Sequence, residues 1–223
     1  MILATAIFDF HYALHIAPTI LYAARITLLA TVLAFLFAMI GGLMLALLRR
    51  SRWFFVRWTA MVCIELLRNT PLLIQLYIVF YVFPFYGLTL SPMVCGILGL
   101  GIQYSAYLSE VYRAGIENLQ RGQWEACTAL GFSSRRTWRR IVLPQILPPM
   151  APVFGNYVIQ MFKDTPLLAT ITVMELLGTA LNDASHSFRY VEPITIVGAT
   201  FLVLSYSSSI VVRKLERKFA VVH

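Results

Sequence analysis

The sequence is poor in lysine and contains none of the common motifs of covalent catalysis. None of its three lysines follows a glycine-rich turn, so the GxxxxGK[ST] loop that holds nucleotide phosphates is absent. HExxH and GxSxG are also absent, and Cys63, Cys95 and Cys127 show no CxxC spacing. These absences exclude a P-loop ATPase, a zinc protease of the HExxH type and a serine hydrolase of the GxSxG type. We therefore expect no catalytic site, no bound cofactor and no resident metal in this chain.

Apolar residues, by contrast, are abundant. They make up 59% of the 223 residues, and the mean hydropathy of +0.75 is far above that of a soluble domain. A membrane-spanning helix needs about 20 predominantly apolar residues, and the sequence has five runs of this kind. They cover residues 20–48, 58–86 (interrupted in its middle), 91–112, 146–175 and 193–212. The sequence therefore predicts an all-α integral membrane protein with about five transmembrane helices.

The basic residues are distributed asymmetrically along the chain. They concentrate between spans one and two, between spans three and four, and after span five. The positive-inside rule then predicts that the N-terminus lies outside and the C-terminus in the cytoplasm. Residues 1–17 form a periplasmic lead-in, residues 18–215 the transmembrane domain and residues 216–223 a cytoplasmic tail. The asymmetry also explains the net charge of +8, so no nucleic-acid partner is expected.

The polar segment between spans three and four predicts two short helices. Residues 123–130 are good helix formers, and Glu125 lies in the first turn, where the helix dipole favours a carboxylate. Gly131 can adopt the left-handed conformation that ends a helix. Ser133 can cap a second helix, which Pro144 terminates or kinks. The segment is therefore predicted to fold as a helix–glycine–helix unit, here called the knuckle (residues 117–144).

The two knuckle helices carry different surfaces. The first is predicted to expose Trp124, Glu125 and Ala126. The second has Trp138 on its apolar side and a stripe of arginines spaced i,i+4 on the other. The members of this stripe are Arg135, Arg136, Arg139 and Arg140. For the stripe alone, binding to anionic membrane lipid is the favoured interpretation.

The spacing within the knuckle closely resembles a known family. Glu125-Ala126, Gly131 and, after a gap, Ile141-x-Leu143-Pro144 match the cytoplasmic loop of permease subunits of bacterial ABC importers. In that family the loop forms a short helix that docks onto the ATPase. Cys127 stands where the family usually has a second alanine, which is a change between small residues. The resemblance implies that Trp124, Glu125, Ala126 and Gly131 couple this chain to an ATPase.

Three further segments resemble the polar amino-acid uptake branch of these permeases. They are residues 65–76, 107–116 and 163–168, so the resemblance extends over about residues 18–215. It implies a type I importer fold in the bacterial cytoplasmic membrane. It also implies ATPase subunits that bind ATP and Mg, a second permease subunit (the same chain or a paralogue) and an extracytoplasmic substrate-binding protein.

Two segments of the chain repeat one another. Residues 68–73 and 163–168 share four of six residue types, and each places a proline, Pro71 or Pro166, inside an apolar span. A proline in a helix leaves a backbone carbonyl unpaired, and interrupted helices at corresponding positions indicate a transport site. Both prolines are therefore hinge candidates, although packing alone is the other interpretation.

Asp164 and Lys163 are charges within a predicted span. Such charges face a partner, a cavity or a water path because they are costly in hydrocarbon. We expect Asp164 to face the substrate path together with Gln160, one turn earlier, and Lys163 to face a neighbouring helix. Four tyrosines are further candidates for the path, although aromatic residues in spans more often only pack. They are Tyr77, Tyr81, Tyr104 and Tyr107.

Two carboxylate–arginine pairs are separated by three residues, Glu65 with Arg68 and Glu110 with Arg113. Both are expected to be structural ion pairs.

The sequence thus predicts a permease subunit of an ATP-driven importer that works by alternating access. A secondary transporter or small channel without ATP is the alternative, but the knuckle would then have no purpose. A membrane scaffold does not account for charges inside a span. The resembled branch carries polar amino acids, and residues 188–193 resemble its ectoine and hydroxyectoine subgroup, so a polar amino acid or related zwitterion is the expected solute.

Overall fold

The computed structural model describes residues 8–219, and within them all regular structure is helical. The π-helical segments are η1 and η3, and the 3-10 segments are η2 and η4. The elements are α1 (Phe10–Arg49), α2 (Phe54–Asn69), α3 (Leu72–Tyr77), η1 (Ile78–Val82), η2 (Phe83–Tyr86), α4 (Pro92–Glu117), α5 (Arg121–Ala129), α6 (Ser134–Thr137), η3 (Trp138–Val142), α7 (Leu143–Asp164), η4 (Thr165–Ile171), α8 (Leu176–Ser187) and α9 (Val191–Phe219).

Helix α1 is longer than predicted span one. It begins at Phe10 because the Asp9 side chain caps it by accepting the Tyr12 N–H. The helix therefore extends into the predicted lead-in, of which residues 1–7 lie outside the described part. Its 40 residues measure about 60 Å at 1.5 Å per residue, well beyond the bilayer core.

Within residues 8–219, α1 and α9 are each long and apolar enough to cross a membrane. Two bent helix pairs raise this number to four if each pair forms one span. One pair joins α2 to Leu72–Tyr86 with a bend of 106°, and the other joins Ser134–Ile171 to α8 with a bend of 43°. The interruption predicted in the middle of span two is therefore confirmed. Predicted span three corresponds to α4. This helix is long enough to cross a membrane, but it is less apolar than α1 and α9 and is not counted with them.

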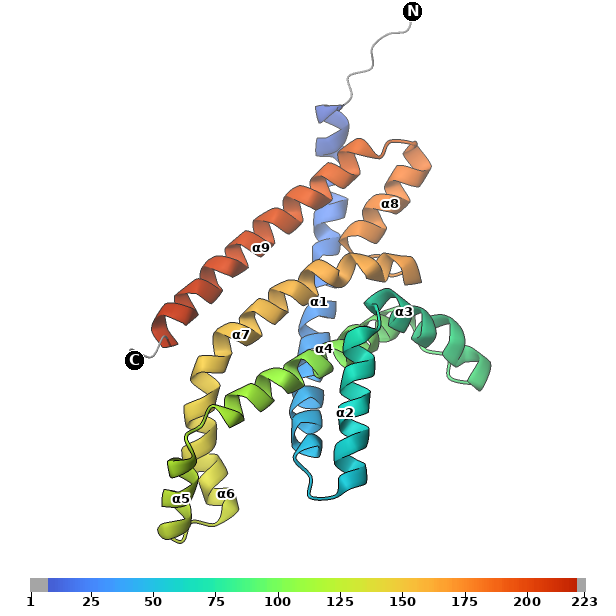
Figure 1. Cartoon of the computed structure of the whole chain (residues 1–223). Coiled ribbons are helices and arrows are strands. Elements are labelled where there is room, and N and C mark those ends of the chain that lie inside the picture. The colour runs from blue at the N-terminus through green and yellow to red at the C-terminus, as the bar shows by residue number, and fades with distance from the viewer. Residues whose placement is uncertain (1–7, 220–223) are drawn as a thin grey trace, which may run out of the picture.

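Helix α4 lies at the centre of the arrangement, which explains its polar character. It packs against α1, α2, α3 and α7 and crosses α1 in Figure 1. Its buried residues include Gln103, Ser105 and Ser109. Because neighbouring helices cover these groups, they need not face lipid.

The contact between α1 and α4 depends on small residues. The buried stripe of α1 is almost entirely alanine, threonine and glycine, and small residues let membrane helices approach closely. At Gly42 the approach is tightest, since an added Cβ would lie 2.8 Å from Leu108 Cβ and 3.0 Å from the Ser105 carbonyl oxygen. Alanine at this position would therefore separate the two helices.

Helix α8 was not expected from the sequence. It is short and ends in polar residues, so it contains no apolar run of spanning length. Glu175 caps its N-terminus by accepting the Gly178 N–H at 2.8 Å. Its apolar side, with Leu176 and Ala180, packs on Ile16 and Ile20 of α1 and on Val197 of α9.

The ends of the helices separate into two groups in Figure 1. The α1–α2 connection and the pair α5 and α6 lie toward one end of the molecule, and the C-terminal end of α9 lies at middle height. The N-terminal end of α1 and the α8–α9 turn lie toward the other. The basic segments at the α1–α2 connection and in the pair α5 and α6 are therefore at the same end, and the orientation of the chain in the membrane stays a prediction.

Candidate functional site

The knuckle turns at Gly131, as predicted. Gly131 has a φ of +66°, in the left-handed region, and comes directly after Leu130, the C-cap of α5. The N–H of Gly131 donates to the Thr128 carbonyl, and the N–H of Phe132 donates to the Cys127 carbonyl, which closes the end of α5. Ser133 then caps α6 by accepting the Arg136 N–H. The turn is therefore determined by hydrogen bonds between residues close together in the sequence.

The surface of α5 differs from the prediction at one residue. Glu125 and Ala126 are exposed and Cys127 is buried. Trp124, predicted to be exposed, is half-buried because its ring packs edge-on against Trp138, with centroids 5.7 Å apart. This aromatic pair fixes α5 against η3, so the exposed part of the helix is held on a rigid support.

The second knuckle helix does not end at Pro144, so of the two predicted alternatives, termination or a kink, termination is wrong. Segments α6, η3 and α7 follow one another without a gap, and Pro144 lies in the first turn of α7. A π-helical segment, Trp138–Val142, comes immediately before it. Proline lacks the N–H that would continue the α-helical pattern, and the π-helix accommodates that loss. Helix therefore runs without interruption from Ser134 to Asp164, and α5 contacts its η3 segment through the Trp124–Trp138 pair.

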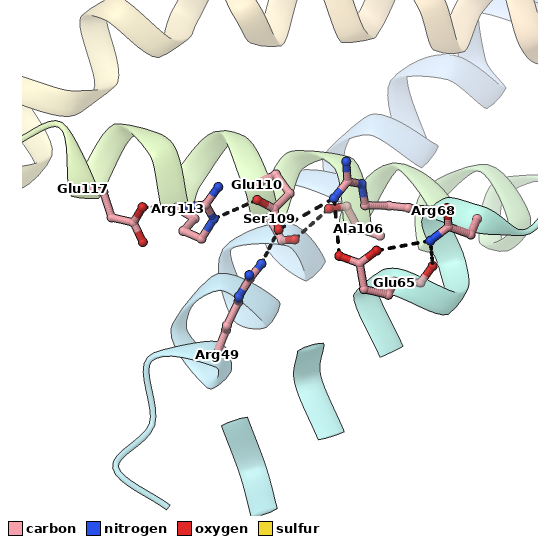
Figure 2. A network of polar contacts seen from close by, with 9 residues as sticks. Arg49, Glu65, Arg68, Ala106, Ser109, Glu110, Arg113 and Glu117 are labelled. Atoms are coloured by element: carbon pink, nitrogen blue, oxygen red, sulfur yellow. Dashed lines mark hydrogen bonds and ion pairs between the residues drawn. The ribbon is translucent and has the colours of Figure 1, made fainter. Parts of the chain in front are cut away.

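Ion pairs connect the ends of α1, α2 and α4 near the knuckle (Figure 2). Glu110 on α4 accepts hydrogen bonds from Arg49 of α1 and from Arg113, the latter at 2.7 Å. Arg68 of α2 approaches both Glu110, at 3.9 Å, and Glu65, at 3.8 Å. Both predicted pairs are confirmed, and Glu110 contacts the arginine of each pair.

An open groove lies beside this network, between α4, α5 and α7. Its volume is about 930 Å³, and its lining combines Glu110 and Arg113 with the amides of Gln123 and Gln145 and the apolar side chain of Met150. The groove is bounded by the knuckle, so it would change shape if α5 moved.

The break in span four brings Asp164 to a cluster of tyrosines. The Tyr104 hydroxyl donates to the Asp164 carboxylate at 2.7 Å. The Tyr107 ring lies 5.8 Å from the Tyr104 ring and is stacked on Tyr157 at 6.0 Å. Tyr104 and Tyr107 were predicted; Tyr157 was not, although its position seven residues before Asp164 places it on the same face of α7.

The other path candidates lie apart from this cluster. Tyr77 and Tyr81 form an edge-on pair of their own, with centroids 5.5 Å apart. Gln160 is exposed and makes no hydrogen bond to Asp164. Lys163 is also exposed and forms no ion pair within residues 8–219, contrary to the expectation that it faces a neighbouring helix.

The two proline breaks have different geometries. Pro71 separates α2 from α3, where the chain bends by 106°. Pro166 lies in the first turn of the 3-10 segment that continues α7. Both prolines mark a change of helix type or direction, as the sequence predicted; whether they act as hinges remains a prediction.

A second polar cluster lies at the opposite end of the molecule. Arg189 forms ion pairs with Asp9, at 3.2 Å, and Glu192, at 2.7 Å, and the Tyr12 hydroxyl donates to Asp183 at 2.7 Å. The hydrogen bond from the Tyr12 N–H, together with nearby Arg189, lowers the pKa of Asp9 below its usual value. These contacts fasten the start of α1 to α8 and α9.

No group of three or more metal-ligating side chains occurs in the part of the chain that the structure describes. The described residues instead combine broken helices, a part-buried carboxylate–tyrosine contact and the knuckle. Broken helices of this kind are typical of membrane transport proteins.

The comparisons identify the family. Residues 38–221 match the binding-protein-dependent transport system inner membrane components, and the chain belongs to this family. It is therefore an inner-membrane protein.

Similar proteins cover nearly the whole chain. A probable amino-acid ABC transporter permease of Sinorhizobium fredii is 41% identical, over 92% of this chain and 89% of that protein. An L-cystine transport system permease of Bacillus subtilis is 35% identical, over 87% and 85%. Among solved structures, one described as an amino acid ABC transporter with histidines superposes with a TM-score of 0.87 at 30% identity, over 95% and 99% of the two chains.

Proposed function

We propose that this chain is the permease subunit of an ATP-driven importer for a polar amino acid or a related zwitterion. The observation that carries the proposal is the knuckle, in which a half-buried aromatic pair supports the exposed Glu125 and Ala126, and a left-handed Gly131 ends the helix. The names of the similar proteins, amino-acid and L-cystine transport permeases, support the solute class.

ATP would act through partner subunits. The chain has no phosphate-binding loop, so ATP and Mg would be bound by separate ATPases onto which α5 docks. When the ATPases close on nucleotide, α5 would move as a rigid unit. The contact between Trp124 and Trp138 would pass this movement to η3, which continues directly into α7. A second permease subunit would complete the path, and an extracytoplasmic binding protein would deliver the solute.

The solute would pass the two broken spans. Asp164, hydrogen-bonded to Tyr104, offers a carboxylate to a cationic group, and the rings of Tyr107 and Tyr157 offer aromatic faces. Pro71 and Pro166 would allow the two halves of each broken span to reorient. Ectoine and hydroxyectoine belong to the zwitterion class and are included among the solutes to be tested.

Reconstitution tests the proposal. The chain, its ATPase and its binding protein are placed in liposomes, and uptake of histidine, arginine, glutamine, glutamate, cystine and ectoine is measured with ATP and with a non-hydrolysable analogue. Uptake of one class with ATP alone supports the importer. Equal uptake with the analogue, or by the chain without its ATPase, would instead establish an ATP-independent transporter or channel.

A further inference from the structure

The turn between α1 and α2 combines unpaired arginines with exposed aromatic rings. The side chains of Arg50, Arg52 and Arg57 are exposed and form no hydrogen bond or ion pair within residues 8–219. The large aromatic residues among them are all more than half exposed, namely Trp53, Phe54, Phe55 and Trp58. Basic side chains together with aromatic rings are typical of the interface between a membrane and water. The turn therefore has the composition of a surface that lies against lipid head groups.

The apolar part of α1 places this turn at the surface of the bilayer. Residues 26–48 contain no charged side chain, and at 1.5 Å per residue they measure about 35 Å, close to the roughly 30 Å of a hydrocarbon core. Arg25 precedes this stretch, with its guanidinium 3.4 Å from the centre of the Tyr22 ring, and Arg49 follows it. The two arginines therefore mark the edges of the bilayer core, and the turn lies just beyond, at the depth of the lipid phosphates.

An open apolar groove begins at the turn and follows α1 away from it. Its volume is about 520 Å³, and it extends from Ser51 to Ile40 along one side of the helix. The residues that line it between these ends are Leu43, Met44, Leu47 and Leu48. At 1.5 Å per residue the groove is about 16 Å long, which is about half the thickness of the hydrocarbon core. One acyl chain of a lipid in the adjacent leaflet therefore fits along it.

The arginines of the turn have no acidic neighbours in the sequence. Residues 10–64 contain neither aspartate nor glutamate. Glu110 of α4 approaches this end of α1, but it accepts a hydrogen bond from Arg49 (Figure 2). The turn therefore has an excess of positive charge beside an apolar groove. Together they fit a molecule that has an anionic end and an apolar chain.

We propose that the α1–α2 turn is a binding site for one anionic phospholipid. The guanidinium groups of Arg50 and Arg52 donate charge-assisted hydrogen bonds to its phosphate, which their planar geometry fits. One acyl chain lies in the groove along α1. The bound lipid thereby holds the end of α1 at the membrane surface, next to the Arg49–Glu110 bond that joins α1 to α4. The site is independent of the transported solute.

Retention of lipid in detergent tests the site. The permease, with the subunits that copurify with it, is mixed with equal amounts of phosphatidylglycerol and phosphatidylcholine that carry the same palmitoyl and oleoyl chains. Native mass spectrometry then counts the lipids that stay bound. Each basic residue near the head groups favours anionic lipid by roughly 5-fold, so two arginines should give a preference for phosphatidylglycerol of roughly 25-fold at one site.

Two variants remove the two parts of the site. Arg50→Gln/Arg52→Gln should retain one phosphatidylglycerol fewer than the wild type, because the head-group contacts are lost. Met44 is 60% exposed and lies about 10 Å along the helix from Ser51. Met44→Trp should therefore obstruct the groove and lower retention of the palmitoyl-oleoyl lipid, while dihexanoyl phosphatidylglycerol, whose chains are too short to reach this position, should bind as it does to the wild type.

A matched control removes the same charge elsewhere. Lys214 and Arg217 are exposed on α9, and Lys214→Gln/Arg217→Gln should retain phosphatidylglycerol as the wild type does. The melting temperature in detergent reports folding of each variant. Excess inorganic phosphate should not displace the lipid, because the free anion has no acyl chain to occupy the groove.

Other results would overturn the site. If Arg50→Gln/Arg52→Gln folds and retains as much phosphatidylglycerol as the wild type, the arginines do not bind the head group. If the wild type retains the two lipids equally, or neither of them, the turn does not select an anionic lipid. Displacement by inorganic phosphate would indicate a site for a soluble anion instead. None of these measurements involves solute uptake, so failure of the lipid site leaves the proposed importer function unchanged.

Discussion

Replacement of Gly131 should weaken coupling to the ATPase in proportion to the strain that the new residue creates. Gly131 has a φ of +66°, and nothing lies within 4 Å of a Cβ added there. A substitution thus introduces backbone strain without a clash. The left-handed conformation costs an L-residue about 1–2 kcal/mol, which corresponds to a roughly 5- to 30-fold lower population of the native turn.

A graded series makes the prediction quantitative. Asparagine tolerates the left-handed region, alanine less so, and the β-branched valine hardly at all. ATPase affinity and solute transported per ATP should therefore fall in the order Gly, Asn, Ala, Val. The measurements are the dissociation constant of the permease–ATPase complex in detergent and coupled uptake in liposomes.

Gly122 provides the matched control. It lies in the same knuckle, also has open space at its Cβ, but occupies an ordinary helical conformation in α5. Gly122→Ala should leave ATPase binding intact and favour the helix by up to about 1 kcal/mol. The reasoning is refuted if Gly131→Val binds and couples like the wild type, or if both glycine sites respond equally to alanine.

Three other predictions concern stability and transport. Glu110→Ala should lower the free energy of unfolding by about 2 kcal/mol, because the Glu110 side chain is only 20% exposed and contacts three arginines. Glu117→Ala should lower it by less than about 1 kcal/mol, because the Glu117 side chain is 53% exposed. Thermal unfolding of both variants in detergent measures the difference. Gly178→Ala should lower the melting temperature clearly, since its Cβ would lie 2.3 Å from a backbone carbonyl oxygen, while Gly198→Ala, with open space, should not. Asp164→Asn should reduce uptake while leaving membrane insertion unchanged, and normal uptake would remove this residue from the path.

Short-range chemistry explains what the sequence predicted correctly. Gly131 and Ser133 act on their own chain neighbours, so the knuckle turn could be assigned from residue type alone. The interruption of span two could also be predicted from the sequence, because Pro71 cannot continue a helix. Both expectations needed only local rules.

Long-range contacts explain what was missed. Glu110 was paired with its sequence neighbour Arg113, but its bond to Arg49 joins residues 61 positions apart. Trp124 was expected to be exposed because its partner, Trp138, lies on a different helix. Helix α8 is too polar and too short to be predicted as a span, and it is stabilised by packing on α1 and α9, which the sequence pattern does not show.

The contact between α5 and the ATPase is the central element of the proposed coupling. A photo-crosslinking amino acid in place of Ala126, which is exposed on α5, should form an adduct with the ATPase subunit when the two are coexpressed. The same probe in place of Phe85, which is 88% exposed in η2 of the broken second span, should form none. Copurification of the ATPase without any adduct at Ala126, or with an adduct at Phe85 instead, would contradict the proposed coupling surface.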